Sequence, residues 1–193
     1  MRQSIPTGQW IRRDGQDWLF DAGSVAIDFA YAGGFGGEPE TLRTPEQLGR
    51  WLAARFPELE GDPTDRELSE AHSLQQSLAR LVTAASRGER AEGEDIDIVN
   101  LFAATPDIPP ALPGGSRQAG RSRVRVGQCL SAITRDAVDV LAEDSADRIR
   151  ACAADDCELI FHDESRSNNR RWCSMQRCGN RSKVRAHRER LGG

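Results

Sequence analysis

The segment CAADDCELIFHDESRSNNRRWCSMQRCGNRSKVRAHRER, residues 152–190, decides the fold of the C-terminal part of this chain. It holds four of the five cysteines, in two C-x4-C pairs that are separated by 15 residues. Zn²⁺ binds about four soft ligands in a tetrahedron, and two short cysteine loops around a hairpin-length insert can supply that shape. The spacing therefore predicts one structural Zn²⁺ ion per chain, held by Cys152, Cys157, Cys173 and Cys178.

Redox chemistry, disulfides and plain core cysteines are the less favoured interpretations of this cluster. Thioredoxin-like redox centres have C-x2-C spacing, which argues against a dithiol switch. Clustered cysteines in a chain without a secretory signal are more often metal ligands than disulfides. Four thiolates would also leave no coordination position for a catalytic water. His162 and His187 are fallback ligands, whereas Cys129 lies in a predicted helix as a small buried apolar group.

The insert between the cysteine pairs has the pattern of a short hairpin. ELIFH (158–162) and RRW (170–172) are predicted strands around the polar turn DESRSNN. Phe161 and Trp172 are expected to pack beside the metal in a module too small for a proper core. Metal binding contributes roughly 10–16 kcal/mol in zinc-finger peptides and would fold such a module. A last helix is predicted over roughly residues 177–190.

Charge is distributed very unevenly along the chain. Residues 1–150 carry 17 Lys and Arg against 24 Asp and Glu, a net charge of −7. Residues 166–193 carry 9 basic residues against one Glu, a net charge of +8. An acidic body with a basic end indicates a polyanionic partner at that end.

The predicted last helix gathers this positive charge on one side. At about 100° per residue, Arg177, Arg181, Arg185 and Arg188 form a single stripe along about 17 Å of helix axis, long enough to follow a nucleic-acid backbone. The expected nucleic-acid contacts are Arg170, Arg171, Arg177, Arg181, Lys183, Arg185, Arg188 and Arg190. The alternative is that some of these arginines pair with acidic groups of the chain itself, including Asp155, Asp156 and Glu158.

The chain before the cysteines is predicted to be mainly helical. Residues 1–17 are expected to form an irregular lead-in, and residues 18–32 suit either a strand or a buried helix. Helix-start signals at Thr44 and Thr64 precede two helices, the second of which spans 65–87. Further elements are expected at these positions: helices over 94–104 and 128–142, an edge strand over 121–126, and loops at 33–37 and 105–120.

The cysteine-rich segment resembles the CGNR zinc finger family. The resemblance rests on C-x4-C, then F-x-D-x-S, then R-R-W-C-S-M-x-x-C-G-N-R-x-K, with the name-giving tetrapeptide at residues 178–181. It implies a four-cysteine zinc site with the ligands given above and a DNA-binding role in bacterial transcription regulators.

Proteins with this finger usually carry an N-terminal ABATE domain, which residues 18–140 resemble in length and layout. The resemblance implies that this domain senses a small molecule or a stress signal. The family tends to have an Asp-hydrophobic-hydrophobic-Asn-Thr pattern near its start. Here the matching stretch begins at Asp28 and has Tyr31 and Ala32 in place of the Asn-Thr pair.

Several function classes find no support in the sequence. No apolar run approaches the roughly 20 residues of a membrane-spanning helix, and the first residues lack the apolar stretch of a secretory signal. We therefore expect a cytoplasmic protein that does not bind a membrane. The chain has neither a phosphate-binding loop nor a G-x-S-x-G elbow, and no enzyme is expected.

The sequence thus predicts a mainly α domain with minor β structure over residues 18–147, followed by a treble-clef-like zinc finger over residues 148–193, a β-hairpin plus a C-terminal helix. The expected function is DNA binding in transcription regulation, with a small-molecule effector for the N-terminal domain. One short helix binds DNA weakly, so we also expect a homodimer or a partner. The alternatives are a finger that binds protein or RNA, and an N-terminal enzyme with a pocket around Asp28.

Overall fold

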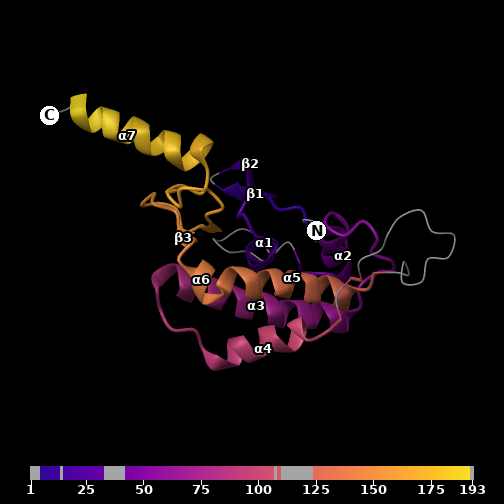
Figure 1. Ribbon diagram of the computed structural model, residues 1–193. Coiled ribbons are helices and arrows are strands. Elements are labelled where there is room, and N and C mark those ends of the chain that lie inside the picture. The colour runs from indigo at the N-terminus through magenta and orange to yellow at the C-terminus, as the bar shows by residue number, and fades with distance from the viewer. Residues whose placement is uncertain (1–4, 14, 33–41, 107, 110–123, 192–193) are drawn as a thin grey trace.

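A computed structural model describes residues 5–13, 15–32, 42–106, 108–109 and 124–191. Its body is built on three long helices that lie side by side in Figure 1. They are α3 (Asp65–Arg87), α4 (Gly93–Ala103) and α5 (Val126–Leu141). The predicted helix over 65–87 is confirmed, and the other two predictions are one or two residues out of position.

Local signals explain where the helices begin and end. Thr44 starts α2 (Pro45–Ala53) and Thr64 starts α3, each through a capping box with the side chain three residues later. Gly88 ends α3 with a φ of 65°, a left-handed conformation that glycine adopts without strain. These caps satisfy backbone donors and acceptors that a helix end leaves unpaired.

A short helix, α1 (Val25–Tyr31), is buried along its whole length. Its N-cap Ser24 donates its hydroxyl to Asp136 of α5, at 2.6 Å, and this contact ties the start of α1 to the long helices. Leu74 and Leu78 of α3 and Ile133 of α5 are fully buried in the same core as α1. The main hydrophobic core therefore lies between α1, α2, α3 and α5.

The N-terminal segment differs from the irregular lead-in predicted for residues 1–17. β1 (Gln9–Arg13) and β2 (Gln16–Phe20) form an antiparallel hairpin in which Trp10 pairs with Leu19. Aromatic and β-branched residues favour strands, and Gly15 has the positive φ, 73°, that a tight turn requires. The boundary predicted at residue 18 therefore falls inside a strand.

The finger follows α6 (Glu143–Ala146) and begins with a small antiparallel pair. β3 (Ile149–Ala151) pairs with β4 (Ile160–His162). The strand predicted at 158–162 is thus partly present, but the one predicted at 170–172 is not a strand. Residues 170–172 instead contact the finger's first cysteine loop, where the amide of Ala153 donates a hydrogen bond to the carbonyl of Arg171.

The chain ends in a helix with an irregular start. One π-helical turn, η1 (Met175–Gly179), leads into α7 (Asn180–Leu191). Figure 1 shows α7 projecting away from the long helices of the body. The predicted fold class, a mainly helical domain followed by a hairpin and a C-terminal helix, is confirmed.

Other predictions fall partly outside the described residues. The loop at 33–37 lies outside them, as does most of the loop at 105–120. Of the edge strand predicted at 121–126, residues 121–123 are not described, Val124 makes an isolated bridge to Leu59, and Val126 already belongs to α5. In the described part of the chain, no helix has the length and apolar character needed to cross a bilayer.

A second hydrophobic core joins the finger to the body. Phe20 of β2, Tyr31 of α1 and Val82 of α3 are buried together with Phe161 and three of the predicted ligands, Cys152, Cys173 and Cys178. A Cβ atom at Gly23 would lie 2.6 Å from the carbonyl oxygen of His162, so the two parts approach at backbone distance. The finger is therefore packed on the body rather than attached by a free linker.

Candidate metal centre and nucleic-acid interface

The structure brings the four predicted ligands into one cluster. The sulfurs of Cys152, Cys157, Cys173 and Cys178 all lie within 4.8 Å of one another. The sulfur of Cys173 is 3.7 Å from that of Cys157 and 3.5 Å from that of Cys178. A tetrahedral Zn–S distance of about 2.3 Å implies S···S distances of about 3.8 Å. The donor set and its spacing therefore fit a tetrahedral Zn²⁺ ion.

Backbone and side-chain donors surround these sulfurs. The amide of Cys173 donates to the sulfur of Cys152 at 3.4 Å. Hydrogen bonds among the clustered sulfurs lower the pKa of Cys152 and raise the pKa values of Cys157 and Cys173. Such donors stabilise thiolates, the form in which cysteine binds metal.

The other candidate ligands lie outside this cluster. Among the described residues, neither His162 nor His187 belongs to it. Cys129 is fully buried in the main core, and burial raises the pKa of its thiol to about 12. This location matches the small apolar role expected for Cys129.

Gly179, the second residue of the Cys-Gly-Asn-Arg motif, lies in close contact with two side chains. A Cβ atom at this position would lie 2.7 Å from the sulfur of Met175 and 3.2 Å from the ring of Trp172. The end of the half-exposed Met175 side chain can move aside, so the contact with the Trp172 ring is the tighter constraint. Gly179 therefore lets the π turn that carries Cys178 pack closely on Trp172.

Asp163, the acid of the F-x-D-x-S pattern, organises the insert. It is fully buried and accepts hydrogen bonds from the amides of Ser165, at 2.9 Å, and Arg170, at 2.7 Å. Burial alone would raise its pKa, but the hydrogen bonds from Ser165 and Arg170 hold the pKa below its usual value. This structural role was not predicted, although the motif pointed to the residue.

Arg170 joins the finger to the body. Its guanidinium donates to the carbonyls of Asp21, Trp172 and Cys173, and it stacks 4.2 Å from the Phe161 ring centre. These contacts occupy much of its hydrogen-bonding capacity. Its neighbour Arg171 is exposed, with its guanidinium 5.1 Å from the Trp172 ring centre.

The basic stripe of the last helix is partly engaged inside the molecule. Arg181 pairs with Asp156 at 3.0 Å, and Arg185 pairs with Asp155 at 2.5 Å. Arg177 lies 5.1 Å from the ring centre of Trp18 in β2. The pairing with Asp155 and Asp156 that the sequence left as an alternative is therefore present. The remaining predicted contacts on α7, all exposed, are Lys183, Arg188 and Arg190.

The body contains a buried ionic cluster that sequence reasoning identified only in part. Asp28 of α1 is fully buried and accepts from the amides of Gly8, at 2.5 Å, and Ala22, at 3.3 Å. Arg55 lies 3.9 Å away, nearly buried, and stacks on Trp51. Burial raises the pKa of Asp28 to about 6. Arg55 gave no separate signal, because its contacts with Asp28 and with the Gly8 carbonyl join residues that lie far apart in the sequence.

Tyr31, which stands where the family pattern has Asn, contacts the finger. Its hydroxyl oxygen accepts a hydrogen bond from the amide of Ile160 in β4 at 2.5 Å. Its ring packs edge-on against Phe20. The helix that carries Asp28 therefore also makes a buried polar contact with the finger, only three residues further along the chain.

Two family models match this chain. Residues 148–191 match the model "CGNR zinc finger", and residues 23–144, more than half of the chain, match "ABATE: Putative stress-induced transcription regulator". A search of curated proteins finds no match. The predicted order, ABATE region followed by zinc finger, is thus confirmed, and the chain belongs to the ABATE family with a CGNR zinc finger after the ABATE region.

Proposed function

We propose that this protein is a non-enzymatic transcription regulator that binds DNA through its zinc finger. The observation that carries the proposal is the position of Cys178, which lies in the π turn directly before the exposed basic helix α7. A metal held there would fix the root of α7 relative to the rest of the finger. The helix then gives up less conformational entropy when it binds a partner.

The chemistry of the helix suits a phosphate backbone. Lys183, Arg188 and Arg190 are exposed, and they belong to the segment 166–193, which carries a net charge of +8. Lys and Arg bind DNA mainly by neutralising phosphates and releasing counterions. Such contacts position a protein on the duplex, whereas base contacts provide sequence specificity.

We propose two further features of the regulator. The buried Asp28–Arg55 cluster in the body is the candidate for responding to a small-molecule effector, since α1 links it directly to the finger through Tyr31. The helix α7 has only 12 residues, and one short helix binds DNA weakly. A homodimer would strengthen binding by supplying a second DNA contact.

The proposal is tested by measuring binding of zinc-loaded protein to duplex DNA over a series of salt concentrations. The variant Lys183→Ala/Arg188→Ala should reduce the slope of log affinity against log salt by about two units, roughly one for each cationic side chain removed. The matched control is Arg50→Ala/Arg66→Ala, which removes the same charge from exposed positions on α2 and α3. It should leave the slope unchanged.

Absence of duplex binding at low salt, in protein that holds zinc and is folded, would contradict DNA binding. Preference for single-stranded RNA would support the RNA-binding alternative. Binding that does not depend on salt would support a protein partner, for which the exposed Met175 and Val184 offer apolar contacts.

A further inference from the structure

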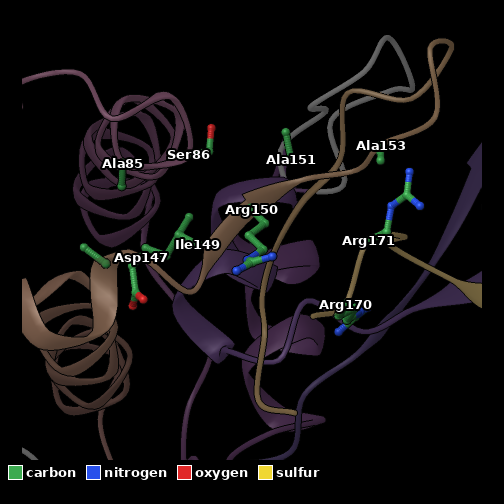
Figure 2. Close-up of a pocket in the computed structure, with 10 residues that line it drawn as sticks. Ala85, Ser86, Asp147, Ile149, Arg150, Ala151, Ala153, Arg170 and Arg171 are labelled. Carbon is green, nitrogen blue, oxygen red and sulfur yellow. The ribbon is translucent and has the colours of Figure 1, made fainter. Parts of the chain in front are cut away.

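A hollow of about 460 Å³ lies where the finger meets the C-terminal part of α3. Figure 2 shows its side chains, with Arg150 from β3 and Arg171 from the segment before Cys173. Ala85 and Ser86 of α3 form the opposite side. The hollow is widely open to solvent, so it suits an extended chain better than an enclosed small molecule.

The walls of this hollow combine small side chains with positive charge. Four alanines line it, which allows close approach to the backbone: Ala85, Ala146, Ala151 and Ala153. Among the residues that the structure describes, three arginines also line it, against the one carboxylate of Asp147. Arg170 is largely engaged with backbone carbonyls. Arg150 is half-buried and interacts electrostatically with the buried Asp163 carboxylate, which already accepts hydrogen bonds from two backbone amides, and Arg171 is exposed. These two arginines therefore supply the positive charge that faces a ligand.

A second hollow continues from the first toward the basic helix. It is lined by residues 169–175 and shares Arg170 and Arg171 with the first. It ends at Met175, the first residue of the π turn that leads into α7. Together the two hollows follow the finger's surface from α3 to the root of the DNA-binding helix.

We propose that this path, defined by Arg150 and Arg171, is a second DNA-backbone site that holds phosphates beside the duplex contact made by α7. The inference rests on the proposed function that the finger binds DNA. Guanidinium groups bind phosphate oxygens through paired hydrogen bonds. The second site would also add phosphate contacts that α7 lacks, because Arg181 and Arg185 are already paired with carboxylates. Arg150 was not among the contacts expected from the sequence.

The test is duplex DNA binding by the full-length, zinc-loaded protein across a salt series. The variant Arg150→Gln/Arg171→Gln should reduce the log–log slope by about two units, which lowers affinity on the order of 50-fold near 0.1 M salt. The charge-keeping variant Arg150→Lys/Arg171→Lys should retain most of the slope. The control Arg50→Ala/Arg66→Ala should match the wild type. Zinc content and thermal unfolding of every variant are measured beside binding.

The outcomes separate this inference from the function on which it rests. If the wild type does not bind DNA, the proposed function fails. If the wild type binds and Lys183→Ala/Arg188→Ala weakens it, but Arg150→Gln/Arg171→Gln leaves the slope unchanged, the second site is wrong and the function stands. An equal decrease in affinity for the Gln and Lys variants would also overturn it, because that pattern indicates a packing role. Inorganic phosphate tests whether the hollow is instead a site for a small anion. If Arg150→Gln/Arg171→Gln loses phosphate binding but keeps the DNA affinity of the wild type, the inference is contradicted.

Discussion

Individual hydrogen bonds, most of them buried, hold the two parts of this molecule together. Tyr31 accepts the buried Ile160 amide, and Arg170 donates to the Asp21 carbonyl at the exposed edge of the contact. The amide of His162 donates to the carbonyl of Ala22 at 2.7 Å. A buried donor that loses its partner costs more than the bond itself contributes, because water cannot replace the partner. These contacts therefore favour one fixed arrangement of finger and body.

Replacing Tyr31 by Phe should show this cost. The ring would still pack against Phe20, but the buried Ile160 amide would lose its acceptor. We expect the free energy of unfolding to fall by about 1–3 kcal/mol. Urea unfolding of zinc-loaded protein measures it, with Leu101→Ala on the exposed face of α4 as the control. Equal stability of Tyr31→Phe and wild type would show that this hydrogen bond contributes nothing.

Asp28 should make stability depend on pH. Its folded pKa of about 6 lies above the usual value because burial penalises the charged form, and nearby Asp21 adds repulsion while Arg55 opposes it. The folded state then binds more protons than the unfolded state between about pH 4 and 6. The contribution of Asp28 to stability must therefore fall as the pH rises through this range, by on the order of 3 kcal/mol.

To isolate this effect, the free energy of unfolding is measured for Asp28→Asn and for wild type at each pH. Both proteins share the pH response of the cysteines, which therefore cancels in the difference. The stability of the wild type relative to the variant should be greater at pH 4 than at pH 7. A constant difference between the two proteins across this range would mean that Asp28 titrates normally.

Helices whose ends carry local sequence signals are predicted well from the sequence. Strands whose pairing depends on residues far away in the chain are not. Thr64, Glu67 and Gly88 act within one helical turn, so the bounds of α3 follow from the sequence. Four cysteines at ligand spacing likewise predict the metal cluster. The pairing of β4 with β3 instead of residues 170–172 depends on packing against Tyr31 and Phe20, which no local pattern reveals.

The N-terminal hairpin was missed for a related reason. Its first strand carries two arginines and an exposed Trp10, so it lacks the apolar alternation of a half-buried strand. Phe20 of β2 is fully buried, whereas the β1 side chains whose burial is described, those of residues 9–12, are partly buried or exposed. Helical spacing predicts that Arg181 and Arg185 lie on one side of α7, whereas their ion pairs depend on how the first cysteine loop folds back on the helix.

The ion pairs on α7 should restrain DNA binding. Asp155→Asn/Asp156→Asn removes two negative charges that hold Arg181 and Arg185. Exposed pairs of this kind contribute little stability, so the fold should persist. We expect tighter binding of duplex DNA and a salt slope steeper by up to about two units.

The matched control for that experiment is Glu94→Gln/Asp97→Asn on α4, which Figure 1 shows on the side of the body away from α7. It removes the same charge and should have a much smaller effect. Equal gains in both variants would indicate general electrostatics rather than release of the two arginines.

At the scale of the whole molecule, the finger and the body share a hydrophobic core. Cys152, Cys173 and Cys178 are buried in the same cluster as Phe20 and Tyr31. The ligands of the metal thus lie directly beside the helix that carries Asp28. A change in the body is therefore expected to reach the finger by packing, without any hinge between them.

Zinc removal should loosen the adjoining part of the body. In zinc-loaded protein treated with a chelator, amides of residues 20–31 should exchange hydrogen faster, because the finger that covers them loses its fold. Amides of α4, which packs on α3 and α5, should keep their protection. Unchanged exchange across residues 20–31 would show that the body folds independently of the metal centre.

In the proposed function, a four-cysteine metal centre displays a DNA-binding surface. The most direct test is anisotropy titration of one labelled duplex at about 0.1 M salt, with protein that is zinc-loaded, stripped by chelator, and reloaded. We predict binding by the loaded protein, a decrease of at least about tenfold in affinity on stripping, and recovery on reloading. Equal DNA affinity with and without zinc would contradict the account, as would a loaded, folded protein that does not bind DNA.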